Sequence, residues 1–194
     1  DALLSDKLDR MVRYGTHILQ PDQGYPLLGA SLAGTVKPYG VYARIAASYP
    51  QFQYVLSRGE AGAAPSGAVV QFPSSGQTVA RSGWAGDFSA QNQLIFDAGP
   101  YRTDHSDRDA LHFTLYGRGQ ALLPDSGLYT YEPGPYRDYF HGTRAHNTVV
   151  VDGLDQETGE SASGDQSDPG RVWADAPVTG PGYVYQNARH TLYE

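Results

Sequence analysis

Apolar residues near the start of the chain recur at the spacing of an α-helix. Charged side chains separate the apolar positions, which are Leu3, Leu4, Leu8, Met11, Val12, Ile18 and Leu19. This pattern predicts an amphipathic helix over residues 2–19 that ends before Pro21. A second apolar stretch over 38–48 is bounded by prolines and predicts another helix, and 51–58 is expected to add a short third. The chain is therefore expected to begin with helices.

The pattern changes after about residue 60, where short runs rich in β-branched and aromatic residues are separated by Gly, Ala, Pro and Ser. These runs predict strands at 68–72, 77–84, 91–98, 110–116, 120–123, 127–131, 146–151, 171–174 and 182–186. Because no helical pattern separates them, an antiparallel sandwich is favoured over βαβ units. The expected fold class is mainly β, with a helical segment over 1–60 and an antiparallel β-sandwich over 61–194. Residues 152–170 lack apolar periodicity and predict a long surface loop.

Composition excludes several classes of function. The formal net charge is −7, and residues 152–175 contribute seven acids against one base, so binding to nucleic acid or to an anionic membrane surface is not expected. The absence of cysteine excludes disulfides, thiolate zinc sites and a cysteine nucleophile. No apolar run approaches the ~20 residues that span a bilayer, and no signal pattern opens the chain, which suggests a soluble mature chain or an excerpt. Tyrosine supplies 15 of the 23 aromatic residues, which suits surfaces that hold sugars.

Residues 101–147 carry four of the six histidines and five arginines. If the polar segment around His105 is extended, His105, Asp107 and Asp109 point the same way, an arrangement suited to a metal ion or to proton transfer. His112 would then face away from them, as a packed or surface strand histidine. For His105 the alternative is a loop histidine bound to its own aspartate neighbours.

Two further motifs end or begin predicted strands. Asp125 lies in the run Leu-Leu-Pro-Asp-Ser-Gly, an apolar strand that ends in Asp-Ser-Gly, where an aspartate forms an Asx turn or serves as a ligand. His146 and Asn147 stand at the start of the predicted strand 146–151, where a rigid element would position their side chains. A simple His/Asn turn before the strand is the alternative.

The order of these motifs resembles a known family. His-x-Asp-x-Asp-Ala-Leu-x-Phe is followed by Leu-Leu-x-Asp-Ser-Gly-x-Tyr-x-Tyr, Arg-x-Tyr-Phe and Arg-Ala-His-Asn-Thr-Val-Val-Val-Asp-Gly. This order resembles the β-sandwich of the heparinase II/III-like polysaccharide lyases, which include alginate and heparan-type lyases. The segment from Leu19 to Gly29 resembles the part of the family that leaves the last helices of an (α/α) toroid. The resemblance implies a supersandwich-like β-sandwich preceded by a few helices from the end of that toroid.

The resemblance also implies a reaction and the residues that take part in it. Members of the family cleave uronic-acid glycans by β-elimination, which requires neutralisation of the uronate carboxylate, a base and an acid. The implied partner is an acidic polysaccharide or oligosaccharide, and the implied location is secreted or periplasmic. His105 matches the histidine that reaches the active cleft, and the residues expected to bind substrate are Arg137, Tyr139, Arg144 and Asn147.

A structural divalent metal is implied as well. Asp125 and His146 match positions that hold a metal, usually zinc, in several relatives, and Asp107 stands where relatives commonly carry a second histidine. A set of Asp107, Asp125 and His146 is rich in oxygen, so calcium and manganese are alternatives to zinc. The family's catalytic tyrosine and carboxylate-neutralising residues lie on toroid helices that would precede residue 1. The chain is therefore expected to be an excerpt that is inactive alone.

Two other classes compete with the lyase hypothesis. One is a non-catalytic carbohydrate-binding sandwich, in which tyrosines and Trp84 stack on sugars and the His/Asp cluster only holds loops. The other is a cupin-like metal oxidoreductase, which is disfavoured because the chain lacks the closely spaced His-x-His with a downstream Glu and His.

Overall fold

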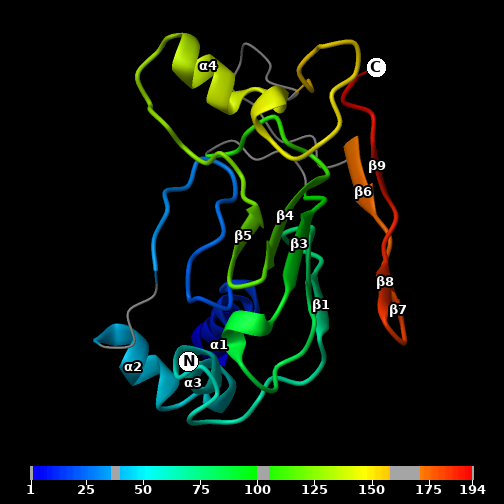
Figure 1. The fold of residues 1–194 in the computed structure, drawn as a ribbon. Helices are drawn as coiled ribbons and strands as arrows, with labels where there is room; N and C mark the ends of the chain where they lie inside the picture. The colour runs from blue at the N-terminus through cyan, green and yellow to red at the C-terminus, as the bar shows by residue number, and fades with distance from the viewer. Residues whose placement is uncertain (1, 36–39, 100–104, 158–170, 194) are drawn as a thin grey trace.

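A computed structural model describes residues 2–35, 40–99, 105–157 and 171–193 (Figure 1). Three helices lead, as the apolar spacing predicts: α1 (Ala2–Ile18), α2 (Val41–Ala46) and α3 (Pro50–Leu56). Within the described ranges no helix is both long enough and apolar enough to cross a membrane.

A five-stranded antiparallel sheet follows the helices. Its strands are β1 (Val69–Phe72), β2 (Gln77–Arg81), β3 (Gln93–Asp97), β4 (His112–Gly117) and β5 (Gln120–Leu123). They lie in sequence order, each paired antiparallel with the next. This meander is what a series of strands without intervening helices predicts.

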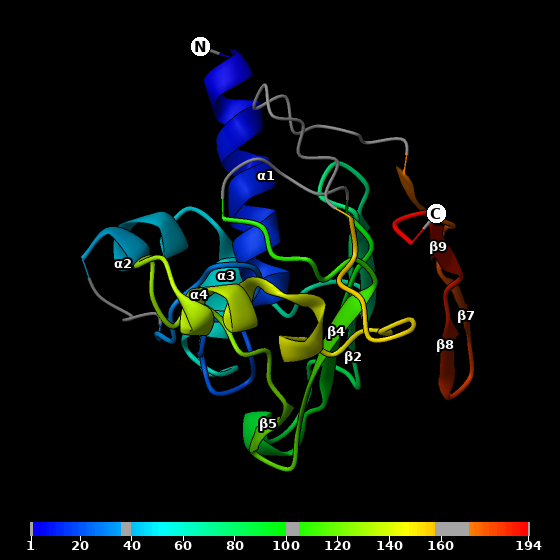
Figure 2. The ribbon, with the colours of Figure 1, turned by 90° about the horizontal axis from the view of Figure 1, so that it is seen from above.

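Two short hairpin-like pairs make a further layer. β6 (Val172–Ala174) pairs with β9 (Ala188–His190), and β7 (Val178–Gly180) pairs with β8 (Tyr183–Tyr185). Figure 2 shows the five-stranded sheet between the helices on one side and these strands on the other. The chain is thus mainly β and of antiparallel sandwich type, which confirms the predicted fold class. The division into 1–60 and 61–194 stays a prediction, although the last leading helix ends at Leu56 and β1 begins at Val69.

The end of α1 is fixed to one face of the sheet. Ile18 packs against Val79 and Ile95 of the sheet. On the same face of each strand, the residues two positions before and after these apolar side chains are polar. Arg81 donates a hydrogen bond to the Leu19 carbonyl, and Gln93 Nε2 donates to the carbonyls of His17 (2.8 Å) and Leu19 (3.0 Å). The last carbonyls of a helix have no partner within the helix, so these side chains satisfy groups that burial would otherwise leave unpaired.

The opposite face of the sheet carries the third layer. Val172 of β6 and Leu192 pack with Ala98, and Phe96 and Leu111 border the same cluster. A short helix, α4 (Pro135–His141), lies beyond one end of the five-stranded sheet and is followed by the 3₁₀ turn η2 (Thr143–Ala145) (Figure 1).

The predicted strands 127–131 and 146–151 are wrong. In the first, the Leu128 N–H donates to the Ser31 carbonyl (2.9 Å) of a distant loop, and no strand ladder forms. In the second, Val151 makes only an isolated bridge with Leu154, and the Thr148 hydroxyl donates to the Ala110 carbonyl (2.7 Å). A β-branched run becomes a strand only where a neighbouring backbone is free to pair with it, and here turns and side chains take those bonds.

Candidate functional site

His105 borders a cavity of about 100 Å³ at the end of the five-stranded sheet where α4 lies (Figure 1). Its Nδ1 lies 2.9 Å from the Tyr131 hydroxyl, and the two rings meet edge to face. The cavity is also lined by Arg137 and His141 of α4, so two imidazoles and one guanidinium border the same space. A cavity of this composition can bind an anionic group and exchange protons with it.

The backbone of His105 is held in an uncommon conformation. Its φ is +61°, and its carbonyl accepts a hydrogen bond from the Ala30 N–H (2.9 Å). Gly29 lies against that carbonyl with a φ of +57°, and a Cβ added there would come closer than 3.0 Å to it. The loop through Gly29 therefore positions His105 by a close approach that only glycine permits.

Asp107 and His141 form a pair on the wall of the same cavity. The Asp107 side chain is buried, and its Oδ1 lies 2.8 Å from Nδ1 of His141. The Arg108 N–H also donates to the His141 carbonyl (3.1 Å), which ties the end of α4 to the segment that carries His105.

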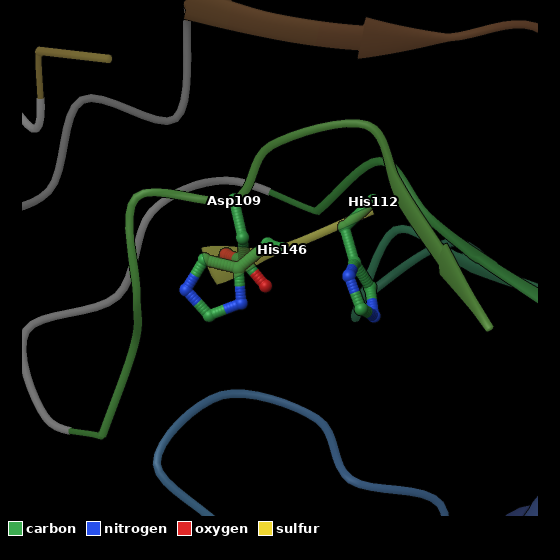
Figure 3. Close-up of side chains that lie close together, drawn as sticks. All are labelled: Asp109, His112 and His146. Carbon is green, nitrogen blue, oxygen red and sulfur yellow. The ribbon is translucent and has the colours of Figure 1, made fainter. Parts of the chain in front are cut away.

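A second group of side chains, the buried group, consists of the buried His112 and His146 and the half-buried Asp109 (Figure 3). Asp109 precedes β4, His112 begins it, and His146 follows η2, yet potential ligand atoms of all three lie within 4.8 Å of one another. Figure 3 shows the carboxylate of Asp109 beside the His146 ring, with the His112 ring facing the same space.

Asp125 supplies a buried negative charge beside this group. Its Oδ2 lies 2.7 Å from His146 Nδ1 and 3.4 Å from His112 Nδ1. Burial alone would raise the pKa of Asp125, but the hydrogen bond and charge of His146 outweigh it, and the pKa falls below the usual range. Burial likewise works to lower the pKa of His146, and the bond and charge of Asp125 overcome it and raise that pKa.

The remaining two members respond mainly to burial. Desolvation raises the pKa of Asp109 well above its usual range, with the nearby charge of His146 opposing the change. Desolvation lowers the pKa of His112, although Asp125 works in the opposite direction. A carboxyl group and an imidazole that both favour their neutral forms therefore face the same small space.

The ring nitrogens of this group fit a metal ion. In the described ranges neither nitrogen of His112 makes a hydrogen bond, although Asp125 lies 3.4 Å from its Nδ1, and Nε2 of His146 makes none either. A buried polar atom without a partner is costly, so such nitrogens call for a ligand. Two imidazoles with a carboxylate are a donor set that zinc and other divalent metals accept, and the residues do not select one metal.

Comparisons with known proteins identify the family to which this chain belongs. Residues 64–193 match the family model described as Heparinase II/III-like, C-terminal. The chain belongs to this family. It is 28% identical over 166 residues to a heparin-sulfate lyase of Bacteroides stercoris, covering 81% of this chain and 24% of that protein. It is 24% identical over 153 residues to a heparin-sulfate lyase of Pedobacter heparinus, covering 75% and 23%.

Solved structures share the fold of this heparinase II/III-like chain. A heparinase III superposes with a TM-score of 0.83 at 22% identity, over 100% of this chain and 29% of that one. A heparan sulfate lyase from Pedobacter heparinus superposes with a TM-score of 0.77 at 20% identity, over 95% and 28%. The chain spans about a quarter of the length of the curated relatives it matches.

Within this heparinase II/III-like fold, the residues of the predicted metal set separate. Asp125 and His146 are in contact, whereas Asp107 is bound to His141 in the neighbouring cavity. The expectation that His112 faces away from Asp109 is wrong. The chain turns between them, with Leu111 at a φ of +61° and the His112 N–H bonded to the Asp109 carbonyl (3.0 Å), and this turn breaks the alternation of an extended strand. The spacing Asp-x-x-His was the signal that could have identified the pair.

The predicted substrate-binding residues occupy different positions. Arg137 lines the cavity beside His105, and Tyr139 is exposed on α4. Arg144 donates to the Gly153 carbonyl (3.0 Å). Asn147 Nδ2 donates to the carbonyls of Phe113 (3.0 Å) and Pro124 (2.9 Å) and so fastens the segment before Asp125 to β4.

Proposed function

We propose that the chain contributes the His105 side of the active site of a lyase that cleaves a heparin- or heparan-type glycosaminoglycan by β-elimination. The observation that carries the proposal is the cavity in which His105, Tyr131 and Arg137 border one space. The names of its relatives, heparin-sulfate lyases, support the substrate class. Because the chain spans about a quarter of those relatives, we also propose that it acts as part of a longer protein.

The residues of the cavity suit the steps of an elimination. A base removes the proton on the uronate carbon next to the carboxylate, the bond from the adjacent carbon to the glycosidic oxygen breaks, and an acid protonates that oxygen. A carbon–carbon double bond remains in the sugar. The guanidinium of Arg137 can bind the carboxylate or a sulfate of the substrate, which are the anions that arginine recognises well.

His105 is suited to the proton steps. The Tyr131 hydroxyl can donate to Nδ1 or accept from it, so the contact persists whichever nitrogen of the ring carries the proton. A ring that can change tautomer without losing its support can both take up and release a proton on its other nitrogen. We assign the acid or base role to His105 on this basis.

The buried group contributes rigidity rather than a step of the reaction. A divalent metal bound to Asp109, His112 and His146 would join the segment that carries His105, strand β4 and the segment after α4. In this proposal Asp125 orients the His146 ring through its 2.7 Å contact with Nδ1 of that ring. We propose zinc as this metal, with calcium and manganese as the alternatives.

The ultraviolet absorbance of the unsaturated product tests the proposal. The full-length protein is mixed with heparan sulfate, heparin, alginate, chondroitin sulfate or hyaluronan, and product is expected from the first two. Arg137→Gln should lower the rate strongly, while Arg118→Gln, in the exposed turn between β4 and β5, should not. Product from alginate alone, or equal rates in the two variants, contradicts the proposed substrate or site.

A non-catalytic carbohydrate-binding role is the second candidate, favoured by the exposed tyrosines near α4. The expected stacking of Trp84 on sugars is wrong, because Trp84 is buried and its indole N–H donates to the Gly67 carbonyl (2.8 Å). Saturable glycan binding without product under any metal or pH condition would favour this role. For either role we propose a secreted or periplasmic location, since glycosaminoglycan polymers lie outside the cell, and fractionation of cells tests it.

A further inference from the structure

Aromatic rings gather on the surface where α4 begins. Tyr129 stacks on Phe140, with ring centroids 5.1 Å apart and an interplanar angle of 15°. Tyr136, in the first turn of α4, has its centroid 5.3 Å from that of Tyr129. In spite of these contacts Tyr129 is 61% exposed and Tyr136 is 65% exposed. We call Tyr129 and Tyr136, backed by Phe140, the tyrosine platform.

Packing within the protein does not account for the tyrosine platform. Ring contacts order the side chains in advance, yet more than half of the surface of each tyrosine stays open to solvent. Pro135 at the start of α4 limits the backbone freedom of the segment that carries Tyr136. Ordered, amphipathic and exposed rings are a feature of binding surfaces, because little conformational entropy is lost when a ligand covers them.

The space beside the tyrosine platform has the composition of a sugar site. A shallow cavity of about 240 Å³ is lined by both tyrosines, two prolines and the polar residues Glu132 and Arg137. Flat apolar faces suit the C–H face of a pyranose ring, and polar groups at the edge suit its hydroxyls.

This cavity is a neighbour of the one beside His105. Thr130 and Arg137 line both of them. A linear molecule that places an acidic group against Arg137 and His105 can therefore reach the tyrosine platform with its next unit. In a glycosaminoglycan, uronic acids alternate with hexosamines, so the neighbour of a uronate is a hexosamine.

We propose that the tyrosine platform is a second sugar-binding site, which takes the hexosamine next to the uronate held beside His105. The inference rests on the proposed function, because that function supplies the alternating glycan. Tyr129 and Tyr136 bind the ring by stacking and take no part in proton transfer. Their removal should therefore weaken binding of the glycan and leave the chemical step unchanged.

Binding and turnover are measured separately to test this site. Binding of a heparan sulfate hexasaccharide is measured by calorimetry in a His105→Ala background, where the glycan is not consumed. Tyr129→Ala and Tyr136→Ala should each raise Kd about 3- to 10-fold, in line with the energy of a single aromatic contact. In the active protein the same changes should raise KM by a similar factor with kcat unchanged.

The controls separate stacking from loss of structure. Tyr129→Phe and Tyr136→Phe keep the rings and should bind within about twofold of the parent. Tyr183→Ala removes a tyrosine of similar exposure, 57%, on the distant strand β8 and should leave Kd unchanged. Tyr136→Ala lies at an exposed helix position, where alanine is well tolerated, so its fold should persist even if Tyr129→Ala unfolds.

The outcomes distinguish this inference from the proposed function. Unchanged Kd in Tyr136→Ala, or an equal loss in Tyr183→Ala, overturns the platform even if the protein forms unsaturated product. If no glycan yields product while Tyr136→Ala still weakens hexasaccharide binding, the lyase proposal fails and the second sugar site stands.

Discussion

Gly29 offers a direct test of how the fold positions His105. Replacing it with alanine introduces a Cβ at a φ of +57°, closer than 3.0 Å to the His105 carbonyl. The left-handed conformation costs about 1 kcal/mol for a residue with a Cβ, and the displaced carbonyl loses its 2.9 Å bond from Ala30, which adds about 1 kcal/mol. We therefore expect Gly29→Ala to lower the free energy of unfolding by about 2–4 kcal/mol once the steric displacement is included.

The effect of Gly29→Ala on activity should exceed its effect on folding. A shift of about 1 Å in a catalytic group can cost roughly 100-fold in rate, and the clash acts on the backbone of His105 itself. Denaturant unfolding gives the stability, and product absorbance at a temperature where the variant is folded gives kcat. The fall should appear in kcat more than in KM.

Gly86→Ala is the matched control for this prediction. Gly86 has a φ of +80°, but a Cβ there meets nothing within 4 Å. This variant carries the same conformational penalty without the clash, so it should lose about 1 kcal/mol of stability and keep its kcat. Equal losses of stability and kcat in Gly29→Ala and Gly86→Ala would refute the positioning role of Gly29.

Three further predictions concern other parts of the structure. Arg81→Met removes the guanidinium that binds the Leu19 carbonyl at the end of α1 and should lower the free energy of unfolding by about 2 kcal/mol, whereas the exposed Arg118→Met should change it little. Burial, with the charges of Arg13 and Arg81, lowers the pKa of His17 from 6.5 to about 4. Between these two pH values the unfolded chain therefore binds a proton at His17 that the folded chain does not bind. The free energy of unfolding falls by about 2–3 kcal/mol as the pH drops from about 6.5 to about 4. In urea titrations His17→Phe should flatten this dependence, and an unchanged slope would contradict it. His112→Gln and His146→Gln should each reduce the divalent metal that elemental analysis finds per chain, while Asp107→Asn, whose carboxylate binds His141, should retain it; equal content in wild type and His112→Gln would refute the buried group as a metal site.

The sequence predicts the regular elements of the fold well where periodicity is strong. The spacing of apolar residues predicts α1, and short β-branched runs predict β1 to β5, from the local sequence alone. The observed bounds lie within a few residues of these predictions. The run Thr-Val-Val-Val after Asn147 has the same composition and forms no strand, because pairing depends on a neighbour that local sequence does not reveal. α4 has only seven residues, too few to show an apolar period, so only Pro135 after Gly134 marked its start.

The candidate site was predictable in part. The motifs identified the segments that meet, and His105 and Arg137 do border one cavity. Which side chains contact one another within those segments depends on backbone conformations that the alternation of residues along a strand does not predict. Leu111 with its positive φ turns His112 toward Asp109, and the position of α4 brings His141 to Asp107. The first pairing arises from a turn, where side-chain direction does not follow the period of a strand, and the second arises from where the end of α4 lies.

Product masses test the central claim most directly. A heparan sulfate hexasaccharide of known mass is incubated with the full-length protein, with its His105→Ala variant and with His190→Ala as a control on β9. Elimination adds no water, so the wild type and the control should yield fragments whose masses add up to that of the substrate, with one newly unsaturated fragment for each bond cleaved. His105→Ala should yield none. Fragments heavier by one water, or the same unsaturated products at the same rate from His105→Ala, would contradict the account.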